Sequence, residues 1–433
     1  MKRRAIELLK DILIVILVLA ILVLTILALP AETLTSTPWL AALLRPFAGV
    51  LGMSQAELTY TEKAVPAMDA AQPLAISIKN TAGRYSCQYD FAVLDSAYET
   101  LGSTLGQALD TAGTLSETTR SRLYAALEEP SAALWYPAEL PAEALATWLG
   151  VEAELDGCMA QLLVLSVQDG AVRLYLCGDQ TRVCDTQVPA EMLVQTLDSF
   201  RPDGSRFAFE DGSGLYQAAA PLSLISDATP QIYAASAQNP CDSRFVTALA
   251  TQMGFNPYGD TSYTDAAGNS FFSETGCSLR VSASGQLLYE SSADARFSAP
   301  SESPESLIET ARGLLDTLAG GVTGSARLYL SGFEQTDGGA VCTFDYVLNG
   351  VSVLQQQGAE PAAGVTFTGS TITELTLSFR TYTLSTQTIA VMPAAQAAAI
   401  VRDGTLLRVC YDDAGGTELS AGWRANQGVT ENG

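Results

Sequence analysis

The chain of 433 residues contains no histidine, and only four of its 23 basic residues are lysines. Without histidine, the chain cannot form an imidazole general base, a Ser-His-Asp or Cys-His nucleophile pair, or a histidine-containing zinc site. No Ser-x-x-Lys sequence precedes a lysine, and there is no Gly-x-Ser-x-Gly elbow, Walker loop or Cys-x-x-Cys pair. Carboxylate-only chemistry is the enzymatic class that these absences leave open.

Positive charge is also scarce, because 47 Asp and Glu residues face 23 Lys and Arg residues and give a formal net charge of -24. Such a surface repels nucleic-acid backbones and anionic lipid headgroups. We therefore expect no nucleic acid as a partner and no attachment to a membrane through a basic patch. The sequence also contains no cofactor-binding motif, and the partner that its composition favours is a protein.

One long apolar run, Ile12 to Leu29, contains no charged residue. About 18 residues at helical rise cover roughly 27 Å, close to the thickness of the hydrocarbon core. The sequence after Leu29 is a poor match to a small-x-small peptidase site, which favours a retained anchor over a cleaved signal peptide. The sequence therefore predicts a cytoplasmic start at 1–11 and a single transmembrane helix at 12–29.

The basic residues before this run set its expected orientation. Positive residues stay in the cytoplasm, and these four precede the run: Lys2, Arg3, Arg4 and Lys10. We therefore expect a single-pass protein of the cell membrane with its bulk extracytoplasmic. Within the run, Ala20, Thr25 and Ala28 are the small or hydroxyl residues. They are the candidate seam for a partner helix, although without a Gly-x-x-x-Gly motif they could equally face lipid.

The rest of the chain predicts an α+β fold, an extracytoplasmic multi-domain body of antiparallel sheets that are each packed with helices. Residues 30–72, rich in Ala, Thr, Pro and Leu, are typical of a juxtamembrane stalk. Residues 73–229 combine strand-like runs, among them YSCQYDFAVLD, MAQLLVLSV and AVRLYLCGD, with helical stretches near Tyr98 to Asp110 and Ser116 to Leu127. Residues 426–433 are expected to fray.

Two intervals, 230–300 and 301–425, share an order of elements in which one amphipathic helix precedes several strands. The first helix is expected from Asp242 to Met253 with Asp242 as its cap, and the second from Pro304 to Leu318 with Ser303 before it. The shared order suggests two related modules, although their sequence identity is too low to prove a duplication.

Eight cysteines follow the apolar run, an even number in a compartment where disulfides persist. Cys177 and Cys184 could bridge a hairpin. The other interpretation is that such cysteines are small apolar side chains facing a core, as the runs GCSLRV, AVCTFDY and LLRVCY suggest.

The acidic residues leave one enzymatic alternative open, a wall glycosidase that uses two carboxylates from distant parts of the chain. The adjacent pairs Glu128-Glu129 and Asp412-Asp413 do not supply it, because neighbouring side chains diverge in a helix or a strand. We expect turn or surface roles for them.

The last third of the chain resembles a known family in three segments: FDYVLNGVSV (344–353), ITELTLSFRTY (372–382) and LRVCYDDAGGTELSAGWRA (407–425). These are similar to the C-terminal modules of the YycH and YycI regulatory proteins, which are related to PepSY-like modules. Within 230–300, GFNPYGDTSYTDAAG followed by SLRVSASGQLLYES resembles the preceding module of the same proteins. The most telling positions are Asn349, Gly350, Tyr411 and Trp423. The family proline after the Asn-Gly turn is absent, and Val351-Ser352-Val353 stand in its place.

The resemblance implies a non-catalytic accessory protein with one transmembrane helix. Its partners would be a sensor histidine kinase of the WalK type and a second YycH- or YycI-like protein, and it would adjust signalling to cell-wall metabolism. A PepSY-like binder or inhibitor of an exported protease has the same fold, so only the identity of its partner distinguishes it.

Overall fold

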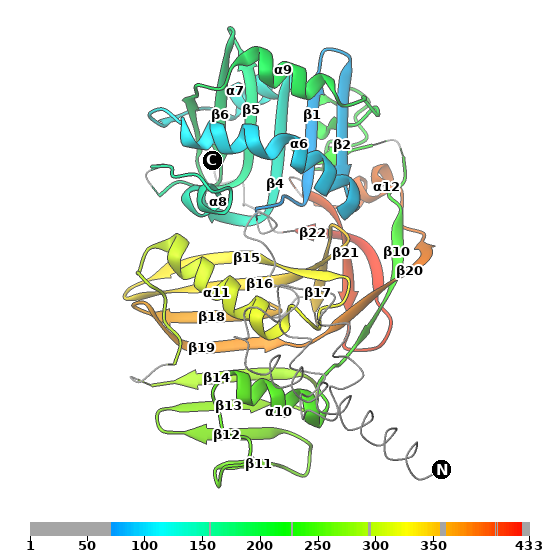
Figure 1. Cartoon of the computed structure of the whole chain (residues 1–433). Helices are drawn as coiled ribbons and strands as arrows, with labels where there is room; N and C mark the ends of the chain where they lie inside the picture. Colours follow the sequence, from blue (N-terminus) through cyan, green and yellow to red (C-terminus); the bar gives the residue numbers. More distant parts are fainter. Residues whose placement is uncertain are drawn as a thin grey trace, which may run out of the picture. The chain divides into compact units, whose positions relative to one another are not determined.

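The computed structural model describes residues 71–155, 157–226, 228–292, 296–355, 361–402, 404 and 406–426. The expected transmembrane helix, with Ala20, Thr25 and Ala28, lies outside these residues, as do the start of the chain, nearly all of the stalk and residues 427–433. Among the helices of the described part, none is both long and apolar enough to cross a membrane. The described residues have an α+β fold of helices and predominantly antiparallel sheets (Figure 1).

The first sheet has seven strands in the order β2-β1-β4-β5-β6-β7-β3, and every neighbouring pair is antiparallel. Its strands are β1 (Ala75–Asn80), β2 (Gly83–Gln88), β3 (Ser116–Glu117), β4 (Ser131–Pro141), β5 (Met159–Gln168), β6 (Ala171–Cys177) and β7 (Thr181–Asp185). Its helices are α6 (Phe91–Asp110), α7 (Arg120–Glu128), α8 (Ala142–Trp148) and α9 (Ala190–Asp198).

Helices cover both faces of this sheet, which explains the nearly continuous apolar run of β5. Helix α7 packs on the face that carries Trp135, Val164 and Tyr175. Leu174 and Leu176 alternate to the opposite face, where α6 and α9 lie (Figure 1). A short segment of β8 (Arg206–Phe207), η2 (Ala208–Glu210) and β9 (Leu224–Ile225) follows.

Helix α6 begins seven residues earlier than the sequence predicts, so reading FAVLD as part of a strand was wrong. The Asp90 carboxylate caps the helix by accepting hydrogen bonds from the backbone N–H groups of Ala92 (3.0 Å) and Val93 (3.4 Å). Tyr89, just before the cap, has a positive φ of 65° that separates the helix from β2.

The second sheet has eleven strands in the order β11-β12-β13-β14-β19-β18-β16-β17-β21-β22, with β15 also paired to β16. All pairs are antiparallel except β17 with β21. The strands are β11 (Ser262–Thr264), β12 (Ser270–Glu274), β13 (Cys277–Val281), β14 (Gln286–Ser291), β15 (Ala326–Thr336), β16 (Gly339–Leu348), β17 (Val351–Gln355), β18 (Ala363–Thr368), β19 (Thr371–Ser378), β21 (Leu406–Asp413) and β22 (Ser420–Asn426).

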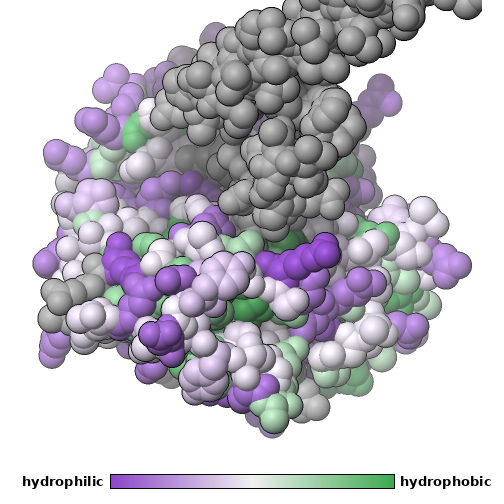
Figure 2. Space-filling model, turned by 60° about the horizontal axis from the view of Figure 1, so that its bottom comes forward, coloured by the Kyte–Doolittle hydropathy of each residue, from purple (hydrophilic) through white to green (hydrophobic). Residues whose placement is uncertain are grey.

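Strands from both of the intervals 230–300 and 301–425 join in this one sheet, where β14 pairs with β19. The associated helices are α10 (Ser243–Gln252), α11 (Pro304–Ala319) and α12 (Ala394–Ala398), and β10 (Ile232–Gln238) pairs with β20 (Thr381–Ile389). The Asp242 carboxylate caps α10, as the sequence predicts. In Figure 2 the end of the molecule that carries β11 to β14 is turned forward, and hydrophilic and hydrophobic residues are interspersed on it.

Candidate functional site

Three pockets of the described structure each contain an arginine paired with one carboxylate. The first is a groove of about 430 Å³ on the seven-stranded sheet. The second is a cavity of about 90 Å³ around Arg380 and Asp413, and the third is an open hollow of about 440 Å³ at Arg296 and Glu274. The three pockets differ in volume and in the hydrogen bonds that their charged groups make.

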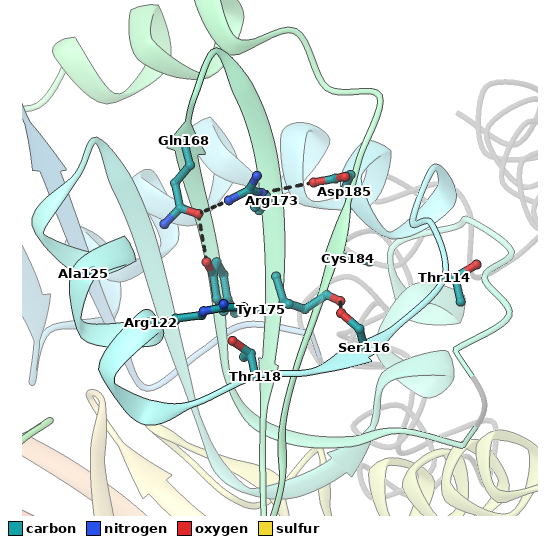
Figure 3. A pocket seen from close by; sticks show the side chains of 11 residues that line it. Thr114, Ser116, Thr118, Arg122, Ala125, Gln168, Arg173, Tyr175, Cys184 and Asp185 are labelled. Carbon is teal, nitrogen blue, oxygen red and sulfur yellow. Dashed lines mark hydrogen bonds and ion pairs between the residues drawn. The ribbon is translucent and has the colours of Figure 1, made fainter.

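The groove lies on the face of the first sheet that α7 only partly covers (Figure 3). Arg173 and Tyr175 of β6 stand opposite Asp185 and Val183 of β7, so these side chains form the floor. The Arg173 Nε donates to Asp185 at 3.1 Å and its Nη1 donates to the Gln168 side-chain oxygen at 2.8 Å. The same oxygen accepts a hydrogen bond from the Tyr175 hydroxyl at 2.9 Å. The Gln168 side-chain oxygen is therefore fully used, and Asp185 is engaged through one of its two oxygens.

The charged and polar groups around the small cavity are hydrogen-bonded to one another. Arg380 binds Asp413 through two parallel bonds of 2.8 Å, and the Tyr382 hydroxyl donates to the same carboxylate at 2.9 Å. The Gln355 amide donates to the Tyr382 hydroxyl at 3.0 Å, and the Gly415 N–H donates to Asp413 at 2.9 Å. Burial, and then the Asp413 charge, raise the pKa of Tyr382 far above its usual range, so the phenol stays protonated.

The expected surface or turn role is wrong for Asp413, whose side chain is only 2% exposed. The expected divergence of the pair is correct, since Asp412 turns instead to Arg424 of β22. Arg380, which lies between β19 and β20, supplies the charge that makes a buried carboxylate tolerable.

The third pocket is held by the ion pair of Arg296 with Glu274. The Arg296 guanidinium lies 4.1 Å from the Phe255 ring centroid and donates to the Met253 carbonyl at 3.1 Å. The Asn256 N–H donates to Glu274 at 2.8 Å, and this bond together with the arginine lowers the pKa of that carboxyl. Glu274 is therefore held ionised.

A glycosidase needs a carboxyl with a raised pKa opposite an ionised one in the same cleft. Burial raises the pKa of Glu139, Asp316 and Asp345, but none of the three lines these pockets. In the described part of the chain, no three His, Cys, Asp or Glu side chains gather closely enough to hold a metal ion. The arrangement supports binding through hydrogen bonds and charge.

No disulfide joins any of the eight cysteines, all of which lie in the described part of the chain. The possible Cys177–Cys184 bridge is absent because the register of β6 and β7 places Cys177 opposite Thr181 and Cys184 opposite Leu174. Both cysteines are buried, as the alternative interpretation expects for small apolar side chains in strands.

Asn349 and Gly350 form the turn between β16 and β17, with φ values of 52° and 80° that suit a tight hairpin. This turn contacts the start of α6. The Asn349 side-chain oxygen accepts a hydrogen bond from the Phe91 N–H at 3.0 Å, and its amide donates to the Tyr89 carbonyl at 3.2 Å. We call this contact the Asn-Gly latch. It satisfies a helix N–H that the Asp90 cap leaves free.

Further polar bonds join the two sheets. Arg327 of β15 binds Asp95 of α6 at 3.1 Å, and its guanidinium lies 4.2 Å from the Phe91 ring centroid. The Val409 N–H of β21 donates to the Tyr89 hydroxyl at 3.2 Å. The Trp148 indole N–H of α8 donates to Glu309 of α11 at 2.7 Å. The sheets are thus joined by polar bonds with defined directions.

Tyr411 and Trp423 lie in β21 and β22, in the packing of the second sheet. Tyr411 is 1% exposed and its hydroxyl donates to the Tyr233 carbonyl at 2.6 Å. The Trp423 indole N–H donates to the Met392 carbonyl at 2.6 Å. Neither residue lines any of the three pockets.

Arg122 and Arg173, the two cations of the groove, are not indicated by any motif of the sequence. In AVRLYLC an arginine and a tyrosine alternate with leucines, which indicates that Arg173 and Tyr175 lie on one face of the strand. The position of α7 over that face follows only from the fold. Comparison with known proteins finds no matching family model, curated protein or solved structure.

Proposed function

We propose that this chain is a membrane-anchored, non-catalytic accessory regulator that binds a sensor histidine kinase of the cell envelope. Its transmembrane helix and extracytoplasmic domains would make the contact and modulate signalling to cell-wall metabolism. The observation that carries the proposal is the pairing of the carboxylate in each pocket with an arginine: Asp185 with Arg173, Asp413 with Arg380 and Glu274 with Arg296. Each of these carboxylates is already bound by a guanidinium, an arrangement that favours binding over catalysis.

The Asn-Gly latch and the ion pair of Arg327 with Asp95 suit a regulator in a second way. They tie the first sheet to the second through directional bonds. A partner that binds one sheet can bias the other only if the two are coupled. The identity of the partner as a kinase of the WalK type rests on the family resemblance.

The test is in-cell crosslinking followed by purification of the full-length protein from solubilised membranes, with a control in which residues 12–29 are exchanged for an unrelated transmembrane helix. We expect recovery of a sensor histidine kinase with the native helix and its loss with the exchanged one. Recovery of an exported protease without a kinase would replace this proposal with the PepSY-like inhibitor.

The proposed helix seam has its own test. Ala20→Ile combined with Ala28→Ile adds bulk where close packing needs small residues, so kinase recovery should fall. The matched control is Val15→Ile combined with Val23→Ile, which introduces the same residue at the same eight-residue spacing on the opposite face of a helix. Equal recovery from both variants would overturn the seam.

A further inference from the structure

The groove on the first sheet is rich in hydrogen-bond donors that have no acceptor. Arg122, three residues beyond the Thr119 cap of α7, lines the groove and is exposed. Its guanidinium makes no hydrogen bond or ion pair with any other described residue, and Figure 3 shows it reaching from α7 into the groove. The buried Thr118 hydroxyl likewise has no partner among the described residues.

Arg173 adds a second guanidinium that is only partly used. Its Nε and Nη1 are bonded to Asp185 and Gln168, whereas its Nη2 has only Asp169 nearby, at 3.7 Å. The Asp169 side chain is 90% exposed, so water screens that contact strongly. The Arg173 side chain itself remains 35% exposed.

The charge of the groove is opposite to that of the chain. Two guanidinium groups line it against one carboxylate, that of Asp185, in a chain with a formal net charge of -24. The Gln168 oxygen already accepts two bonds and Asp185 binds Arg173, so the positive charge of Arg122 has no carboxylate partner in the lining. A ligand that fits must therefore bring acceptor atoms and negative charge.

We propose that this groove, formed by Arg122 of α7 and by Arg173 of β6, binds an oxyanion, the carboxylate or phosphate of a small ligand or of a chain end. A guanidinium donates in a fork that matches either group with two parallel bonds. The volume of about 430 Å³ accommodates a group the size of a dipeptide or a glycerol phosphate. This site is independent of the proposed kinase partner and gives residues 73–229 a role of their own.

The test is isothermal titration calorimetry on the full-length protein in nanodiscs, in a buffer free of phosphate and carboxylates. The probes are glycerol 1-phosphate and N-acetyl-alanyl-alanine, with glycerol as the neutral control. Binding of either anion but not of glycerol supports the site, and the tighter anion identifies whether phosphate or carboxylate is the natural group. No binding of either anion overturns the proposal.

Substitutions of the two groove arginines test whether the anion binds in the groove. Arg122→Gln and Arg173→Gln should each raise the Kd of the anion at least about tenfold, because each removes a charge-assisted hydrogen-bond donor. The matched control is Arg182→Gln, which removes the same charge from the opposite face of β7 and should change the Kd less than about twofold.

Arg122 makes no bond that stabilises the fold among the described residues, so its variant should keep the wild-type melting temperature even if Arg173→Gln does not. An unchanged Kd in folded Arg122→Gln protein, or an equal loss in Arg182→Gln, would overturn the proposal.

Discussion

Two arginine–aspartate pairs with the same chemistry have opposite surroundings in this protein. Arg380 and Asp413 are 10% and 2% exposed, and the carboxylate accepts bonds from a guanidinium, a phenol and a backbone N–H. Arg173 and Asp185 are 35% and 76% exposed, and they share a single hydrogen bond at the edge of an open groove. In the first pair, groups of the protein itself supply the hydrogen bonds of both side chains. In the second pair, Arg173 keeps a hydrogen-bond donor that a ligand can use.

The comparison shows that an ion pair indicates a role only together with its exposure and its remaining bonds. A buried pair has given up hydration, so each partner depends on the other. A solvated pair contributes little to stability, and either partner can rearrange when a ligand arrives.

The largest effect is expected from Asp413→Ala, which leaves the buried Arg380 without its counter-ion. We expect a loss of about 3–5 kcal/mol in the free energy of unfolding, measured by denaturant titration. Asp185→Ala removes the same group from the open pair and should cost less than about 1 kcal/mol. Similar losses for the two variants would contradict the contrast.

Two glycines with a φ of 80° form the next comparison. A Cβ on Gly350 would lie 3.1 Å from both the Leu94 side chain and the Tyr89 backbone nitrogen, whereas a Cβ on Gly170 would meet nothing within 4 Å. Gly170→Ala should cost about 1–2 kcal/mol from its backbone conformation alone. Gly350→Ala should cost about 1–3 kcal/mol more, because it also disturbs the Asn-Gly latch. Equal losses of stability in the two variants, measured by thermal melts, would show that the Asn-Gly latch can accommodate a Cβ without cost.

Asp316 and Glu309 of α11, which both bind Arg312, should respond to pH in opposite directions. Burial raises the pKa of Asp316 to about 6. The folded chain therefore holds a proton that the unfolded chain releases, and stability from this group falls as pH rises from about 4 to 6. Asp316→Asn should lessen that fall by about 1–2 kcal/mol, measured as the free energy of unfolding at several pH values.

Glu309 provides the matched comparison for Asp316. Burial alone would raise its pKa, but the bonds from Arg312 outweigh burial and lower it. Its contribution to stability is present above the pKa of the unfolded chain and is lost as pH falls through the lower folded value. Glu309→Gln should therefore destabilise the protein at neutral pH and have less effect in acid. The same pH response in both variants would contradict these assignments.

The smallest effect is expected from thiol reagents on the folded protein. Burial raises the pKa of Cys87, Cys177 and Cys342 to about 12, so their reactive thiolates are scarce at neutral pH. Cys241 is the one cysteine that is not fully buried. Burial opposes ionisation of Cys277 as well, but hydrogen bonds from Ser291 and Tyr289 lower the pKa of its thiol. Mass spectrometry should therefore find at most two N-ethylmaleimide adducts on the native protein, at Cys241 and Cys277, and eight after denaturation without a reductant. Fewer than eight adducts would reveal a disulfide.

The local pattern of the sequence was sufficient to predict much of the fold. The runs MAQLLVLSV and AVRLYLC form β5 and β6, and Asp242 caps α10, because strand alternation and helix capping are local properties. The start of α6 was mispredicted because the apolar residues before Tyr98 suit a strand as well as a helix. The Asp90 cap that decides between them was overlooked.

The sites could not be predicted in the same way, because distant segments build them. Arg122 and Arg173 line one groove only because α7 packs on β4 and β5 of the sheet, and the burial of Asp413 depends on Arg380. Asn349 was singled out by family resemblance and as part of a turn. Its bond to Phe91 follows from the packing of one sheet against the other.

The Asn-Gly latch also sets an order of events during synthesis. The Phe91 N–H in the first turn of α6 donates to Asn349, which lies 258 residues later in the chain. The donor to the Tyr89 hydroxyl, the Val409 N–H, lies 320 residues after Tyr89. At about 5–20 residues per second, a ribosome needs roughly 13 to 50 seconds to make the first of these stretches. The amino-terminal sheet therefore emerges with an unfinished helix end, and only the arrival of β16 and β17 completes it.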